Sequence, residues 1–238
     1  MTAQIIAEQG PEVKDATAPY PFLYTWSTSN GARPMILAEL LEINYYLHPV
    51  DLAAKEQKKP WYLEHNANGK IPTLASTDID GSTTFVNESA AILLYLADKY
   101  DKERKYSYAL GSKEYYEELE WLFFELSGFC PKKVQWKYLN NLQEKNQPAI
   151  DEQFDEMVRL LRVIDTRLKS NGTGYLVGDH ISPADITVYP WIRPGQTVGF
   201  EDNIKKLPYL KAWIETIGKI PAVQNALDVN MSLQSRTD

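Results

Sequence analysis

The pattern of apolar residues changes after Tyr100, and this change constrains the fold of the 238-residue chain more than any other feature. Before it, short apolar runs alternate with amphipathic stretches, as in a sheet interleaved with helices. Beyond it, nearly every periodic segment has helical spacing. We therefore expect an α+β domain over 19–101, a charged linker over 102–111 and an all-helical domain over 112–238. Residues 1–18 are mostly polar and small, and predict a flexible leader.

The first domain contains two helices and four strands in an order that is typical of one fold. Four apolar runs have the composition of strands: Phe22–Trp26, Tyr45–Val50, Ile71–Ala75 and Thr84–Val86. One helix is expected from Pro34 to Leu41, with the proline in its first turn, and another from Glu88 to Tyr100. Asp80-Gly81, between the last two strands, is a hairpin signal. The order βαβ, hairpin, α is the thioredoxin-like arrangement.

The second half contains two long helical patterns and one capping motif. Tyr115–Asn140 predicts a helix that is kinked near Gly128 and Pro131. Phe154–Leu168 predicts an amphipathic helix that ends at a glycine-rich turn. In Ile181-Ser182-Pro183-Ala184-Asp185-Ile186, the serine is expected to cap a helix and the aspartate to complete a capping box. This motif specifies the fold and carries no chemistry.

Charge and composition exclude several classes of function. A net charge of -7 argues against a nucleic-acid partner, because phosphate binding needs clustered Lys and Arg. Cys130 is the only cysteine and the three histidines lack ligand spacing, so we expect no metal site. The sequence has neither a signal-peptide pattern nor an apolar run of membrane-spanning length. We expect a cytoplasmic protein with no membrane partner.

Four motifs occur in an order that resembles one enzyme family. They are Ser29-Asn30-Gly31, Asn68-Gly69-Lys70-Ile71-Pro72, Asn87-Glu88-Ser89 and Ser182–Asp185. With an α-helical second half, the chain resembles a cytosolic glutathione transferase from about Pro21 to Asp228. Within that family it is most similar to the bacterial nu class and its fungal relatives, which include the yeast nitrogen regulator that forms a prion. In those relatives the first corner reads Thr-Pro-Asn-Gly or Ala-Pro-Asn-Gly, whereas here it reads Thr28-Ser29-Asn30-Gly31.

The resemblance implies glutathione as co-substrate and assigns residues to its parts. Ile71, before Pro72, would pair with the backbone of the glutathione cysteine, as an added strand does. Glu88 and Ser89, at a helix start, would bind the ammonium and carboxylate of the γ-glutamyl end. Gln57 and Lys70 match positions that hold the glycyl end, and solvated surface is an equal alternative for both.

The corner itself carries no thiol, so any thiol must come with the ligand. By resemblance, Asn30 would donate a hydrogen bond to the glutathione sulfur, with Thr28 or Ser27 as a second donor. Such a donor, next to a helix N-terminus, favours the thiolate and lowers the thiol pKa. An Asn-Gly turn explains Asn30 equally simply, and the two roles are compatible.

The thiolate would attack an electrophilic carbon, a disulfide or a peroxide. Phe129, Cys130 and Trp136 are candidates to line the electrophile pocket, although core packing explains such residues more often. The resulting expectation is a glutathione transferase, with conjugation and disulfide or peroxide reduction both open. The alternative is a glutathione-binding regulatory or interaction protein with little turnover. A homodimer is also implied by the resemblance.

Overall fold

The computed structural model describes residues 4–5, 20–78, 80–197 and 199–236. They form two compact units. The first unit comprises the described residues within Met1–Tyr106 and Ile220–Asp238, and the second comprises those within Ser107–Lys219. Within the described part of the chain, no helix combines the length and apolar character that crossing a bilayer requires.

The first unit is built on a mixed sheet with the strand order β1-β3-β2-β4-β5. The strands are β1 (Gln4–Ile5), β2 (Phe22–Thr25), β3 (Tyr46–Pro49), β4 (Thr73–Thr77) and β5 (Thr83–Asn87). β2 and β3 are parallel, whereas β4 is antiparallel to both β2 and β5. The four predicted strands are confirmed, each within two residues of its expected ends.

β1 lies within residues 1–18, for which the sequence predicts a flexible leader. Gln4 and Ile5 pair in parallel with Tyr46 and Leu47, so β3 is flanked on both sides. Pro49 is the last residue of β3, so its missing N–H does not interrupt the backbone hydrogen bonds between the strands. The other residues of the predicted leader lie outside the described residues.

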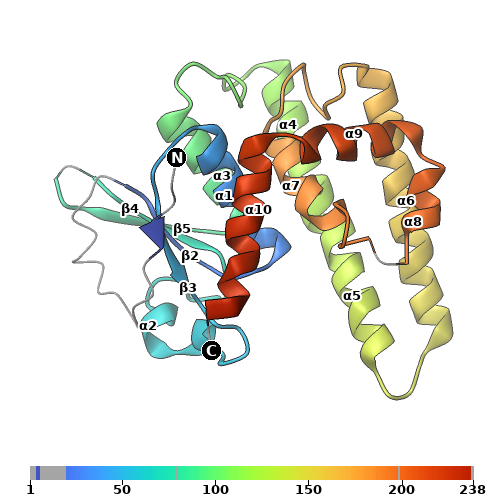
Figure 1. Cartoon of the computed structure of the whole chain (residues 1–238), viewed down its shortest axis with the longest axis horizontal. Coiled ribbons are helices and arrows are strands. Elements are labelled where there is room, and N and C mark those ends of the chain that lie inside the picture. The colour runs from blue at the N-terminus through green and yellow to red at the C-terminus, as the bar shows by residue number, and fades with distance from the viewer. Residues whose placement is uncertain (1–3, 6–19, 79, 198, 237–238) are drawn as a thin grey trace. The chain divides into compact units, whose positions relative to one another are not determined.

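Helices cover the sheet of the first unit. α1 (Ser29–Leu40) packs against α3 (Ser89–Tyr100), and α10 (Pro221–Ser232) lies beside α1 (Figure 1). α10 falls within 112–238, the range predicted for the helical domain, yet its contacts place it in the first unit. The apolar side chains of Val223, Ala226 and Leu227 are buried there, which accounts for its docking.

An aromatic core occupies one face of the sheet. Phe22 and Tyr24 of β2 form a buried cluster with Val50, Tyr62 and Ala75. Tyr62 belongs to the short helix α2 (Pro60–Leu63), which follows the 3-10 turn η2 (Glu56–Lys58). This core therefore ties the segment between β3 and β4 to the sheet.

The second unit is all-helical. Its helices are α4 (Lys113–Phe124), α5 (Cys130–Asn141), α6 (Gln147–Asn171), α7 (Pro183–Ile192), α8 (Glu201–Lys205) and α9 (Pro208–Gly218). α5 and α6 pack side by side (Figure 1). At the position of the predicted kink the helix changes to a π-helical turn, η3 (Glu125–Phe129), which contains Gly128 and ends just before Cys130-Pro131. Ser127 Oγ donates to the Phe123 carbonyl across this turn at 2.7 Å.

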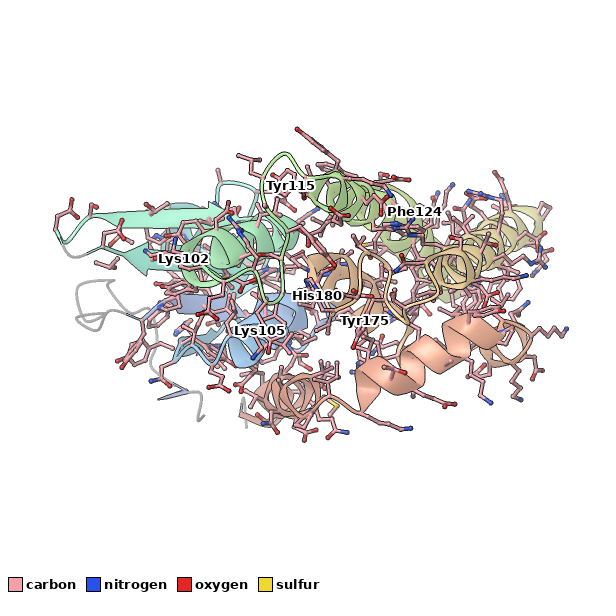
Figure 2. The ribbon with its side chains drawn as sticks, turned by 90° about the horizontal axis from the view of Figure 1, so that it is seen from above. Lys102, Lys105, Tyr115, Phe124, Tyr175 and His180 are labelled. Carbon is pink, nitrogen blue, oxygen red and sulfur yellow. The ribbon has the colours of Figure 1, made fainter. Side chains whose placement is uncertain are left out.

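The predicted capping box at the start of α7 is confirmed. The fully buried Asp185 carboxylate accepts hydrogen bonds from Ser182 N (3.1 Å), Leu176 N (3.0 Å) and Trp213 Nε1 (2.7 Å). The loop before α7, in which Figure 2 labels Tyr175 and His180, is thereby joined to the helix. Asp185 thus connects α7, α9 and this loop within the second unit.

Candidate functional site

The register of the sheet brings three predicted motifs to one edge. Tyr24, near the end of β2, pairs with Thr73 at the start of β4, and Thr73 pairs with Asn87 at the end of β5. The corner after β2, the Ile71-Pro72 segment before β4 and Glu88-Ser89 after β5 therefore meet there. All three belong to the first unit.

The corner is the start of α1, which begins at Ser29 and not near Pro34 as predicted. Thr28 is the N-cap, and its Oγ1 accepts a hydrogen bond from Gly31 N at 2.9 Å. Pro34 is therefore the sixth residue of the helix and cannot donate the usual intrahelical bond, and the buried side chains that follow it, from Met35 to Ala38, stabilise the helix through packing. Since the Thr28 oxygen accepts within the protein, its hydrogen is left to donate elsewhere. Asn30 is the second residue of the helix and is half-buried.

The backbone of the corner is closely packed. A Cβ on Gly31 would lie 2.3 Å from the Trp26 carbonyl oxygen and 2.5 Å from Thr25 Oγ1. The Trp26 carbonyl also accepts hydrogen bonds from Thr28 N at 2.7 Å and from Asn230 Nδ2 of α10 at 3.1 Å. Only glycine fits position 31, and α10 anchors the corner from behind.

The Ile71–Pro72 peptide bond is cis, and the loop before it is held by buried side chains. Tyr62 Oη and Asn66 Nδ2 each donate to the Lys70 carbonyl at 2.7 Å. Asn66 is almost fully buried, although its sequence context, Asn66-Ala67-Asn68-Gly69, is typical of an exposed turn. Sequence reasoning missed this supporting role because only burial distinguishes Asn66 from a turn residue.

A chain of hydrogen bonds joins this loop to the start of α3. Asn66 Nδ2 donates to Thr73 Oγ1 at 3.0 Å, and Thr73 Oγ1 donates to Asn87 Oδ1 at 2.8 Å. Asn87 Nδ2 in turn donates to the His65 carbonyl at 3.0 Å. The two segments are therefore fixed relative to each other by buried or half-buried groups.

The start of α3 presents Glu88 and Ser89. Glu88 is exposed and has φ +72°, a left-handed conformation that is uncommon outside glycine. Ser89 is the first helical residue and is 4 % exposed. Its Oγ accepts a hydrogen bond from Arg33 Nη1 at 2.9 Å, and Arg33 is 0 % exposed. Sequence reasoning did not single out Arg33, because nothing local shows that it faces α3.

The structure also brings the regions of Gln57 and Lys70 together. Gln57 is half-buried in η2, and a Cβ on Gly69 would lie 2.7 Å from its carbonyl oxygen. Lys58 Nζ donates to the Asn68 carbonyl at 3.1 Å, which holds η2 against the same loop. The Lys70 side chain is exposed.

The three residues predicted for the electrophile pocket all belong to the second unit. Phe129 is 2 % exposed, and Cys130 is half-buried. The Trp136 ring packs against Phe200, with 5.3 Å between centroids. Within the described residues, no group of three His, Cys, Asp or Glu side chains is placed to hold a metal ion.

Comparisons with known proteins agree with this architecture. Residues 29–99 match the family profile described as glutathione S-transferase, N-terminal domain, and residues 90–221 match that of the C-terminal domain. Glutathione S-transferase 1 of Schizosaccharomyces pombe is 35% identical over 171 residues, which cover 70% of this chain and 72% of that protein. The disulfide-bond oxidoreductase YfcG of Escherichia coli is 31% identical over 86% of this chain and 93% of its own.

A solved structure extends the likeness over almost the whole chain. It is the glutathione transferase URE2P8 from Phanerochaete chrysosporium with oxidized glutathione, at a TM-score of 0.83 and 30% identity. The match covers 93% of this chain and 100% of that one. The predicted thioredoxin-like domain, followed by an all-helical domain, is confirmed by this fold and by both family profiles. The chain belongs to the glutathione transferase family.

Proposed function

We propose that the chain binds glutathione at the sheet edge described above and activates its thiol. The observation that carries the proposal is the Tyr24–Thr73–Asn87 register, which places the corner, the cis-proline segment and the start of α3 next to one another. These segments offer a backbone edge, a helix N-terminus and polar side chains. A cysteinyl peptide with a charged amino-acid end needs these groups.

Each part of glutathione has a proposed partner in the first unit. The Ile71 backbone pairs with that of the cysteine. The Ser89 hydroxyl and the first N–H groups of α3 bind the γ-glutamyl carboxylate, and Glu88 binds the ammonium. Gln57 and Lys70 bind the glycyl carboxylate, and the contact of η2 with the 68–69 loop supports pairing them.

Asn30 and Thr28 are the proposed catalytic residues. A free thiol has a pKa of about 8.5, so only a few per cent is ionised at neutral pH. The Asn30 amide and the Thr28 hydroxyl are donors at the N-terminus of α1, where the helix dipole also favours an anion. The cap bond to Gly31 supports Thr28 as a donor, because it uses the hydroxyl oxygen and not its hydrogen.

The thiolate then attacks either an electrophilic carbon or a disulfide. In the second case it forms a mixed disulfide and releases a thiolate, and a second glutathione resolves the product to oxidized glutathione. The names of the YfcG oxidoreductase and of the URE2P8 structure with oxidized glutathione favour testing this reaction first. Phe129, Cys130 and Trp136 remain the proposed contacts for the electrophile.

Retention on immobilised glutathione tests binding, and turnover with 2-hydroxyethyl disulfide and a model electrophile tests catalysis. In Asn30→Ala we expect glutathione affinity within several-fold of wild type but a raised pKa of the bound thiol, measured from the ultraviolet absorbance of the thiolate. Asn68→Ala, an exposed amide in the same domain, is the control. An unchanged thiol pKa in Asn30→Ala would remove that residue from the mechanism, and binding without turnover of either substrate would favour the regulatory alternative.

We further propose a homodimer that is formed through α4 and α5. Tyr116 and Phe123 of α4, and Val134 and Tyr138 of α5, are each more than half exposed, and each pair has helical spacing. Exposed apolar patches mark association sites. Phe123→Glu is expected to give a monomer by light scattering, whereas an unchanged mass would exclude this surface.

A further inference from the structure

A buried guanidinium lies directly behind the hydroxyl that is proposed to bind the γ-glutamyl carboxylate. Arg33 belongs to α1, one turn after Asn30, and is 0 % exposed. Its Nη1 donates to Ser89 Oγ at 2.9 Å, across the contact between α1 and α3. Burying a guanidinium is costly unless its N–H groups are well used. The hydrogen bonds that Arg33 donates are therefore needed to offset the cost of burying its charge.

The chemistry of the two side chains gives this bond a direction. Arginine has only donors, whereas a serine hydroxyl has one hydrogen and two acceptor lone pairs. Ser89 must therefore accept from Arg33, and its single hydrogen is left for another partner. A carboxylate accepts hydrogen bonds but does not donate them, so a carboxylate ligand needs Ser89 as a donor.

We infer that Arg33 is a positioning residue that holds Ser89 as a hydrogen-bond donor toward the γ-glutamyl carboxylate of glutathione. This inference rests on the proposed function. An acceptor at position 33 would instead take the Ser89 hydrogen and turn the hydroxyl away from the ligand. Arg33 also places a positive charge behind the N-terminus of α3, which acts in the same direction as the helix dipole.

The test compares glutathione with the analogue that lacks the α-carboxylate of the γ-glutamyl residue, γ-aminobutyryl-cysteinyl-glycine. The ratio of the Kd of this analogue to the Kd of glutathione isolates the carboxylate contact, since a general loss of folding weakens the binding of both ligands alike. In Arg33→Met, which has no N–H donor for Ser89, we expect the ratio to fall roughly five- to twentyfold toward that of Ser89→Ala. In Arg33→Lys, which has only donors, we expect it to stay within about threefold of wild type.

Two further readouts separate positioning from a merely structural role. The kcat of Arg33→Met at saturating glutathione and the pKa of the bound thiol are expected to match wild type, because the corner is untouched. The double variant Arg33→Met with Ser89→Ala is expected to lose no more discrimination than Ser89→Ala alone. Arg33→Leu, which also lacks the donor, replaces Arg33→Met should the latter not fold.

Retained discrimination in a folded Arg33→Met or Arg33→Leu, or additive losses in the double variant, would overturn the inference. Loss of discrimination in Arg33→Lys equal to that of Ser89→Ala would also overturn it. A wild-type protein that binds both ligands equally, or neither, would instead refute the proposed glutathione site itself.

Discussion

Acidification is expected to destabilise the first unit through one buried histidine. His48 of β3 is 4 % exposed and packs among aromatic rings, with its centroid 5.5 Å from Trp61 and 5.6 Å from Tyr24. Burial lowers the pKa of His48 from 6.5 to about 4, and nearby Glu56 offsets this only in part. The folded protein therefore holds the neutral ring in a pH range where the unfolded chain binds a proton.

The sign and size of the effect follow from linkage. Because the folded-state pKa is the lower one, the stabilisation is complete above pH 6.5 and is lost as the pH falls toward 4. The difference between the pKa values of 6.5 and about 4 corresponds to about 3 kcal/mol in the free energy of unfolding. Of this, about 2 kcal/mol is lost by roughly pH 5.

Denaturant unfolding at a series of pH values tests this, with His48→Phe as the variant. We expect the free energy of unfolding of wild type to fall more steeply with acidification than that of His48→Phe. His65→Phe is the graded comparison, since burial also lowers the pKa of the half-buried His65. Parallel curves for wild type and His48→Phe would refute the reasoning, because the phenylalanine cannot titrate.

Three other substitutions test the packing of the site and the core by denaturant unfolding. Gly31→Ala is expected to cost about 1–3 kcal/mol, because contacts of 2.3 and 2.5 Å outweigh the higher helix propensity of alanine; a gain in stability would contradict this. Asn66→Ala is expected to cost about 1–3 kcal/mol and to raise the glutathione KM, whereas exposed Asn68→Ala changes neither. Asp185→Asn is expected to cost about 2–4 kcal/mol, because its amide cannot accept from the Leu176, Ser182 and Trp213 donors together. Asp179→Asn, at an exposed position of the same loop, is its control, and equal losses would argue against the role of Asp185.

Several parts of the fold can be predicted from side chains that are close together in the sequence. The four strands of the hairpin and βαβ unit, the capping box of Ser182 and Asp185, and the break near Gly128 each follow from side chains close in sequence. α1 shows the limit of this reasoning. Pro34 resembled a first-turn proline, but the Thr28 cap bond to Gly31 starts the helix earlier.

Tertiary contacts decided what the sequence could not show. Nothing in the sequence of α10 distinguishes a helix of the second unit from one that packs on α1, because both would bury the same apolar face. Likewise, the short strand β1 depends on a partner, β3, that lies about forty residues away along the chain.

The same distinction separates the residues that face the proposed ligand from those behind them. Thr28, Ile71 and Ser89 stand in recognisable motifs, so sequence reasoning could select them. The residues that support them do not stand in recognisable motifs. Tyr62 and Asn66 hold the Lys70 carbonyl next to Ile71, and Arg33 holds Ser89.

In the proposed mechanism, these supports allow a corner without a thiol to activate the thiol of its ligand. The proposed contacts to the sulfur and the carboxylate are hydrogen-bond donors, and an anion is stabilised only by donors whose hydrogens point toward it. At Thr28 and at Ser89 a neighbouring N–H occupies the hydroxyl oxygen and thereby leaves the hydrogen for the ligand. The two hydroxyls at opposite ends of the proposed site are thus oriented by the same device, from Gly31 at one end and Arg33 at the other. Removing the Arg33 donor should therefore weaken anion binding at the Ser89 end alone.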